Sequence, residues 1–190
     1  MALPARIFPV MDAGLETRGS EADTLRRARR GDAAAFERLY REHAPAIYTL
    51  AIRLTGNQTA AEDIVQDTFL RMFGFLSGLR DDAPLRPWLK RVASNLAIDR
   101  IRREHRYGSD ESLWMLESTD ASRDDAADAD ALLRRLPPQA RTLMWLHEVE
   151  GWSHAELAKR FKRSESWSKS ILSRALARLR EDMDTGTDDA

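Results

Sequence analysis

The chain has 190 residues, enough for one large domain or two small ones. It contains no cysteine, which excludes disulfides, thiolate metal sites and a cysteine nucleophile, and fits a reducing cytoplasm. No apolar run approaches the length of a membrane span, and the opening segment MALPARIFPVMDAGLE lacks the apolar core of a signal peptide, so we expect a cytoplasmic protein without membrane insertion.

The charges nearly cancel, at a net charge of −1, but they are segregated along the chain. Residues 86–106 hold seven basic and two acidic side chains, and residues 153–180 hold eight and two. Between them, residues 104–130 hold two basic and nine acidic side chains. Two basic blocks on either side of an acidic one predict two polyanion-binding modules and a linker.

The helical pattern begins at residue 23, after a tail over 1–22 that we expect to be poorly ordered. Asp32 is a candidate N-cap for a first long helix, and Gly56 is placed to end it. Pro45 is expected to bend or interrupt this helix near its middle.

A second helix is expected from residue 60 to about residue 76, opened by a capping box of Thr59 and Glu62. Its inward arc consists of Ile64, Val65, Thr68, Phe69, Met72, Phe73 and Leu76. An acidic and amide-bearing stripe, made of Glu62, Asp63, Gln66, Asp67 and Leu70, projects the other way. This stripe is either a docking patch for a partner protein or a solvated face with one stray leucine, and periodicity leaves both open.

A loop over residues 79–87 precedes a helix expected over 88–103. Its polar side carries Lys90, Arg91, Ser94 and Asn95. After Leu96 the apolar positions rotate to a different side, so the helix either kinks near Asn95 or is covered on two sides. A positive cluster ends it, made of Arg100, Arg102, Arg103 and Arg106. The cluster exceeds what a helix C-terminus requires and favours nucleic-acid contact.

Residues 107–130 are acidic and rich in Ser and Asp, which is typical of a flexible linker. The apolar run Leu113–Leu116 interrupts this pattern. It could anchor the linker to a domain or contact a regulator.

A second domain is expected over residues 131–183, followed by a short tail over 184–190. Pro137 and Pro138 are suited to start its first helix. Ser153 and Glu156 then form a capping box that opens a pair of helices with a tight joint. The second of these helices has an apolar arc of Ile171, Leu172, Ala175, Leu176 and Leu179. Its opposite arc consists of Ser166, Lys169, Ser170, Ser173 and Arg174.

Two helices at this spacing predict a helix-turn-helix, whose basic outer face suits phosphates and base edges in a major groove. The alternative is an ordinary helical hairpin with a solvated basic face. Enzyme chemistry finds little support: His147 lies near Glu148 and Glu150, but the HExxH spacing of a zinc site is missing, as are a phosphate loop and a serine elbow. We therefore expect no catalysis, cofactor or metal.

Two segments resemble a known family. AAEDIVQDTFLRMF followed by RPWLKRVASNLAIDRIRR is similar to the first conserved domain of bacterial RNA polymerase sigma factors. LPPQARTLMWLHEVEGWSHAELAKRF is similar to the start of their last conserved domain. The short connection between the two segments is typical of the extracytoplasmic-function group. The resemblance implies an all-α protein with two small helical domains, the first over residues 23–106, joined by the acidic linker.

The resemblance also implies roles for residues. The stripe Glu62, Asp63, Gln66, Asp67 and Leu70 would dock on the clamp of the largest subunit of core RNA polymerase. Recognition and melting of the −10 element would fall to Trp88, Lys90, Arg91, Asn95, Arg100, Arg102 and Arg103, with Trp88 and Asn95 near a pocket for an extruded base. Reading of the −35 duplex would fall to Ser164, Ser166, Trp167, Lys169, Ser170, Ser173 and Arg174. An anti-sigma factor is a further implied partner.

Three positions depart from the family pattern in the helix-turn-helix. Lys162 stands where glycine is usual, and a left-handed backbone there would cost around 1 kcal/mol. Ser168 occupies the centre of the apolar arc. Trp167 lies beside Ser166 on the polar arc; it either fills the weakened core or faces DNA, and we prefer the second interpretation.

Two other functions fit parts of the pattern. A helix-turn-helix regulator could bind DNA without joining polymerase, and an interaction protein could bind the polymerase clamp or a regulator without a promoter. Promoter-specific transcription with core polymerase separates both from a sigma factor.

Overall fold

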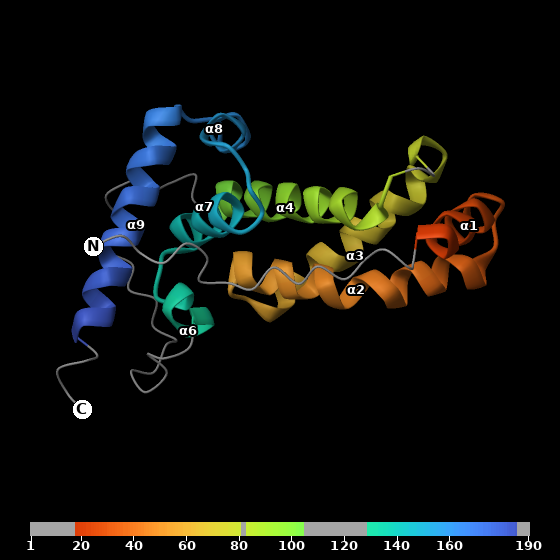
Figure 1. Ribbon diagram of the computed structural model, residues 1–190, viewed down its shortest axis with the longest axis horizontal. Helices are drawn as coiled ribbons and strands as arrows, with labels where there is room; N and C mark the ends of the chain where they lie inside the picture. Colours follow the sequence, from red (N-terminus) through yellow and green to blue (C-terminus); the bar gives the residue numbers. More distant parts are fainter. Residues whose placement is uncertain (1–17, 81–82, 105–128, 186–190) are drawn as a thin grey trace.

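The computed structural model describes residues 18–80, 83–104 and 129–185, and these residues fold into helices joined by short turns (Figure 1). The first domain contains α1 (Arg18–Arg29), α2 (Ala33–Thr55), α3 (Gln58–Gly74), the 3-10 turn η1 (Leu76–Gly78) and α4 (Leu85–Glu104). The second contains α6 (Ala129–Arg134), α7 (Pro138–Glu148), α8 (His154–Phe161) and α9 (Glu165–Thr185). The all-α, two-domain prediction is confirmed.

The outermost described helices extend beyond the ranges in which helical pattern was expected. The first helix begins at Arg18 and not at residue 23, while the second domain runs from Ala129 to Thr185. Arg106 and the run Leu113–Leu116 lie outside the described residues.

Helix α2 has the predicted caps. The Asp32 side chain accepts a hydrogen bond from the Ala35 amide at 3.1 Å, and Gly56 ends the helix with a φ of 66°. The prediction that Pro45 could interrupt the helix is wrong, because α2 is continuous from Ala33 to Thr55. Pro45 lies on the exposed side, and the fully buried Leu39 and Ile47 on either side of it hold the helix against the core.

Helix α3 begins earlier than expected. Asn57 is its N-cap, accepting from the Ala60 amide at 2.8 Å, so the capping box assigned to Thr59 and Glu62 is wrong. The expected inward arc is buried except for Phe73, whose side chain is 64% exposed at the end of the helix. Phe73 meets α2 through an edge-on contact with Phe36, at 5.4 Å between ring centroids.

Helix α4 starts at Leu85, ahead of Pro87, and not at Trp88. The Glu21 carboxylate of α1 accepts a hydrogen bond from the Leu85 amide at 2.9 Å and so caps the helix. It is a single helix that contacts α2 and α3 and also α7 and α8 (Figure 1). Cover on two sides therefore explains the rotating apolar positions, and it also explains why Ser94, expected on a polar side, is buried.

In the second domain, α8 opens with the predicted capping box: Ser153 and Glu156 satisfy each other's backbone amides. Lys162 ends α8 at a φ of 57°, and it is the one non-glycine residue with positive φ in the described ranges. The backbone at Lys162 is therefore left-handed, the conformation that carries the cost considered above.

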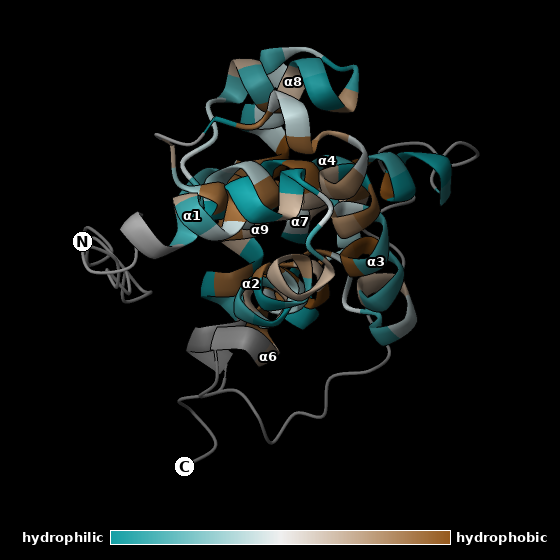
Figure 2. Ribbon diagram, turned by 90° about the vertical axis from the view of Figure 1, so that its right-hand side faces the viewer, coloured by the Kyte–Doolittle hydropathy of each residue, from teal (hydrophilic) through white to brown (hydrophobic). Residues whose placement is uncertain are grey.

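The apolar core is continuous from one domain to the other. Leu50 and Leu54 of α2 belong to the same buried cluster as Leu143 and Leu146 of α7. Figure 2 shows apolar residues on the inner sides of the packed helices and polar ones on the outside. Among the helices of the described segments, none combines the length and apolar character needed to cross a bilayer.

Candidate functional site

The stripe predicted on α3 lies on its solvent side. Its members, Glu62, Asp63, Gln66, Asp67 and Leu70, are all exposed. Leu70 is 60% exposed, which is unusual for a leucine on a well-packed helix. Burial of the opposite side of α3 forces these residues outward, so their common direction follows from the helical period.

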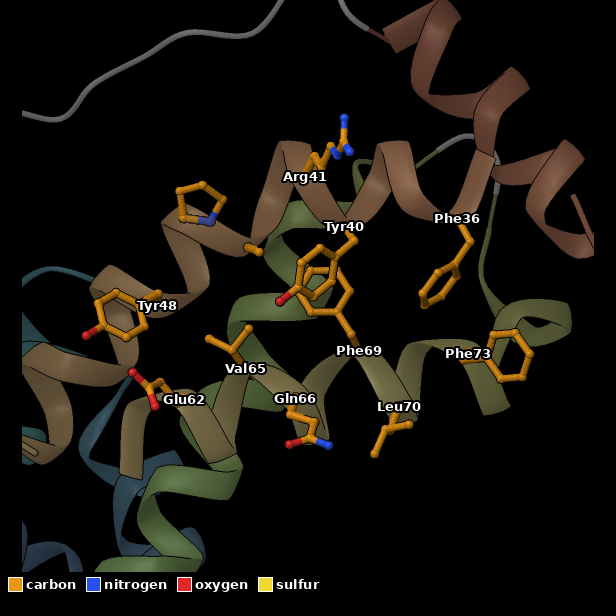
Figure 3. A pocket seen from close by; sticks show the side chains of 12 residues that line it. Phe36, Tyr40, Arg41, Tyr48, Glu62, Val65, Gln66, Phe69, Leu70 and Phe73 are labelled. Atoms are coloured by element: carbon orange, nitrogen blue, oxygen red, sulfur yellow. The ribbon is translucent and has the colours of Figure 1, made fainter. Parts of the chain in front are cut away.

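An apolar groove of about 810 Å³ runs beside this stripe, between α2 and α3 (Figure 3). Phe36 and Tyr40 reach into it from α2, and Phe69 and Phe73 from α3. The Tyr40 and Phe69 ring centroids lie 4.7 Å apart. Sequence reasoning missed the groove, although the four-residue spacing of Phe36 and Tyr40 places them on one face of α2. The stripe and the groove together form a mixed polar and apolar surface suited to a helical partner.

The residues predicted to contact the −10 element lie along α4. Trp88 is half-buried near its start and stacks on Phe75, with ring centroids 6.0 Å apart and planes 5° apart. Lys90 and Asn95 are half-buried, and Arg91 is exposed.

Arg100 and Arg103 have partners within the first domain. The Arg100 guanidinium pairs with Asp63 at 3.0 Å and with Glu104 at 3.0 Å, and the hydrogen bond that it donates to Asp63 raises the pKa of Arg100 above its usual value. Arg100 is thus tied to the α3 stripe and stands apart from Lys90 and Arg91. Arg103 is exposed and donates to the Asp99 carbonyl at 3.3 Å.

The first turns of the α4 face meet the second domain. Lys90 Nζ lies 2.8 Å and 3.1 Å from the two carboxylate oxygens of Glu150. Arg91 pairs with Glu156 at 2.8 Å, and its guanidinium carbon lies 3.6 Å from the Trp152 ring centroid. Further along, Arg102 lies 3.3 Å from Asp99 and 3.5 Å from the Arg160 carbonyl oxygen.

The outer arc of α9 is open to solvent. The side chains of Ser166, Lys169, Ser170, Ser173 and Arg174 are all exposed on it. Arg174 donates to the Ser170 hydroxyl at 3.2 Å. Ser164, also exposed, accepts from the Trp167 amide at 3.1 Å and so supports the start of the helix. The predicted −35 residues are thereby gathered on one face, with the exception of Trp167.

Trp167 packs against the core, which favours the core-filling interpretation over the preferred DNA-facing one. Its half-buried ring packs on Phe161 at 5.4 Å between centroids and belongs to the rim of the core. Its indole nitrogen is buried as well. Ser168 is fully buried and lies 3.0 Å from Nδ1 of His154. The small polar Ser168 leaves the apolar arc underfilled, and the large Trp167 ring supplies the missing apolar area.

The histidines of this domain have structural partners. The His147 and His154 rings stack with centroids 4.3 Å apart, and His147 Nδ1 lies 2.7 Å from the Trp152 carbonyl oxygen. Burial, followed by the charges of His147 and Lys169, lowers the pKa of His154. This favours the neutral ring that a hydrogen bond to Ser168 can use.

One group of candidate metal ligands occurs in the described part of the chain. Ligand atoms of Glu21, Glu42 and His43 lie within 4.8 Å of one another. Glu21 already caps α4 through Leu85 and lies 3.2 Å from His43 Nε2. The arrangement is explained by helix packing, and we assign no metal to it.

Two protein families match the chain in the order of its domains. Sigma-70 region 2 matches residues 39–107, and Sigma-70 region 4 matches residues 127–179. The first match contains α3, α4 and most of α2, and the second contains α7, α8 and most of α9.

Two mycobacterial sigma factors are similar to the chain over most of its length. The chain is 36% identical over 159 residues to the ECF RNA polymerase sigma factor SigL of Mycobacterium tuberculosis, a match that covers 78% of this chain and 89% of the relative. It is 29% identical over 181 residues to SigM of the same species, covering 94% and 92%. Among solved structures, the sigma factor RpoE in complex with the anti-sigma factor NepR from Bartonella quintana has a TM-score of 0.49 and 23% identity, covering 78% of this chain and 96% of that one.

Proposed function

Because the chain belongs to the extracytoplasmic-function RNA polymerase sigma factors, which direct promoter-specific transcription initiation through regions 2 and 4, we propose that each of its exposed faces has a separate task in initiation. The α3 stripe docks on the clamp of the largest polymerase subunit, the α4 face binds the −10 element, and the outer arc of α9 reads the −35 duplex. The protein is not an enzyme, and its place of action is the cytoplasm, with core polymerase and promoter DNA.

The α3 surface carries the polymerase assignment. Its stripe presents acidic and amide groups beside Leu70, and the groove adds exposed aromatic edge from Tyr40 and Phe73. A partner helix with basic and apolar residues would satisfy both halves of this surface. An exposed leucine of this kind is what a binding surface leaves open in the free protein.

For the −10 element, α4 offers cations for phosphates and aromatic rings for bases. Lys90, Arg91 and Arg102 lie on the part of the helix that meets the second domain. The stacked Phe75 and Trp88 rings lie near the start of α4, beside the loop where we place the pocket for an extruded base.

For the −35 element, the exposed arc of α9 supplies Lys169 and Arg174 for phosphates or bases and serine hydroxyls for either. Trp167 is withdrawn from this set because it packs inward. The joint at Lys162 fixes the angle between α8 and α9 and so determines how deeply the arc can enter a major groove.

The decisive experiment is transcription of sheared genomic DNA by core polymerase with and without the chain, read by sequencing of transcript 5′ ends. We expect a discrete set of start sites that depends on the chain. Gln66→Ala with Leu70→Ala should weaken core binding about tenfold or more, since exposed anchors dominate such interfaces. Asp63 is avoided because its loss would also release Arg100.

The matched control is Arg30→Ala with Glu37→Ala, two exposed positions of the same domain that do not line the groove. Core binding should be unchanged in this control. Equal binding by both double variants would refute the docking surface. DNA binding without promoter-specific transcripts would instead indicate a regulator that works apart from polymerase, and core binding with neither would indicate an interaction protein.

We also propose, on the family resemblance, that an anti-sigma factor inhibits the chain. The surface that such a protein would need to block is the stripe and groove that core polymerase uses. Full activity in cells with no inhibitory partner bound to the purified chain would contradict this.

A further inference from the structure

The basic face of α4 is occupied by acidic and aromatic residues from the turn between α7 and α8 and from α8 itself. Glu150 meets Lys90 through both carboxylate oxygens, and Glu156 meets Arg91 at 2.8 Å. Trp152 lies beneath the Arg91 guanidinium and is 6% exposed. Two carboxylates thus sit on the two cations that we assign to DNA phosphates.

The contacts between α4 and the second domain continue toward the end of α4. Arg160 of α8 donates to the Asn95 carbonyl at 3.2 Å and pairs with Asp99 at 2.8 Å. Arg102 lies within 3.5 Å of the Arg160 carbonyl oxygen. From Lys90 to Arg102, successive turns of α4 are therefore engaged by the second domain (Figure 1).

A second contact between the domains lies where α7 meets the C-terminus of α2. Thr142 donates to the Leu54 carbonyl at 2.8 Å, and Arg141 lies beside Gly56. Burial, together with Arg134, lowers the pKa of Arg141 to about 10, so its guanidinium stays charged at neutral pH near the negative end of α2. The Arg53 guanidinium of α2 lies 4.6 Å from the Trp145 ring centroid.

The ion pairs between α4 and the second domain can be broken easily. The Arg91 and Glu156 side chains are 46% and 43% exposed, and pairs this open to water are weak and sensitive to salt. Residues 105–128 connect the two domains and could span on the order of 80 Å if extended. The chain length therefore permits the domains to separate, while the tether keeps the local concentration of the cover high.

We propose that the second domain is an intramolecular cover for the −10 face, in which Glu150 and Glu156 take the places of DNA phosphates on Lys90 and Arg91. This proposal rests on the proposed function, in that it takes α4 to be the −10 surface. The α3 stripe and the outer arc of α9 stay exposed in the covered form. The free chain can thus meet polymerase and duplex DNA, but single-stranded −10 DNA must displace the cover, which suppresses DNA binding away from polymerase.

The test uses two double variants of the full chain. One combines Glu150→Gln and Glu156→Gln, and the control combines Glu37→Gln and Glu148→Gln. Both double variants lose two negative charges, and glutamine at position 156 can still complete the capping box. Glu37 and Glu148 are exposed and form none of the contacts between α4 and the second domain that are described above. The readouts are the radius of gyration by small-angle X-ray scattering and the anisotropy of a labelled random-sequence single-stranded oligonucleotide.

We expect the Glu150 and Glu156 variant to be larger and to bind the oligonucleotide about tenfold more tightly than either the control or the unmodified chain at the same salt. Equal size and equal affinity in all three would overturn the cover. Expansion without tighter binding would also overturn it, because the covered face would then not be the one that holds single-stranded DNA. Failure of the proposed function is separate and visible as the absence of chain-dependent transcripts in all three proteins.

Discussion

The two basic faces of the molecule are in opposite situations. On α4, Lys90 and Arg91 are paired with glutamates of the other domain. On α9, Lys169 and Arg174 lie on an arc that is exposed to solvent. Both faces were predicted from the same kind of pattern, a basic stripe opposite an apolar one, and the fold treats them differently.

The difference follows from what each helix packs against. Helix α9 packs against α7 and α8, and its basic arc is left exposed. Helix α4 lies between α2 and α3 on one side and the second domain on the other, so part of its polar side is covered as well as its apolar one. A charged face on a surface helix is available for binding, whereas one on a central helix becomes available only when a neighbour moves.

The largest expected effect concerns Trp167, which lies at the buried edge of the exposed α9 face. Trp167→Ala should lower the free energy of unfolding by about 2–3 kcal/mol, because the ring fills a core weakened by Ser168. Trp167→Phe should retain most of this stability. Urea unfolding of the full chain measures both, and the exposed neighbour Ser166→Ala should stay within about 0.5 kcal/mol. Unchanged stability of Trp167→Ala combined with altered duplex binding would return Trp167 to the DNA-facing set.

The next largest effect concerns the contact between α7 and the C-terminus of α2, which supports the covered face of α4. Gly56 and Gly31 both have positive φ, at 66° and 86°, so alanine costs about 1 kcal/mol at each. A methyl group at Gly56 would also lie 2.4 Å from a guanidinium nitrogen of Arg141, while at Gly31 nothing lies within 4 Å. Gly56→Ala should therefore destabilise the chain by about 1 kcal/mol more than Gly31→Ala and should also expand it in solution. Equal losses in urea unfolding and no expansion would mean that Arg141 does not hold α7 against α2.

Local features of the fold were predictable because neighbouring residues decide them. Asp32, Gly56 and the Ser153 and Glu156 box cap their helices as predicted, since each cap is completed within a few residues. The stripe on α3 followed from helical period alone. The choice between Asn57 and Thr59 as a cap was not predictable in this way, because both residue types suit the role and the packed geometry selects one.

The features that periodicity left open or missed depend on how helices pack against one another. Trp167 lies where either burial or exposure fits the period, and only the contact with Phe161 decides between them. The pairs of Lys90 with Glu150 and of Arg91 with Glu156 join residues on different domains. The segregated charge in the sequence predicted two basic modules. It gave no indication that basic residues of the first domain would pair with acidic residues of the second.

The smallest expected effect is the pH dependence that His43 contributes to the stability of the first domain. Burial, the dominant cause, and Arg86 of α4 lower the pKa of His43 below its ordinary 6.5, against the opposing charges of Glu21 on α1 and Glu42 on α2. The unfolded chain then binds the proton more readily than the folded one, so stability is complete above pH 6.5 and falls as the pH drops through the interval below it. Urea unfolding at pH 7.5, 6.5 and 5.5 should show this decline, and His43→Asn should remove part of it. An identical pH profile in His43→Asn would show that His43 titrates alike in the folded and unfolded chain.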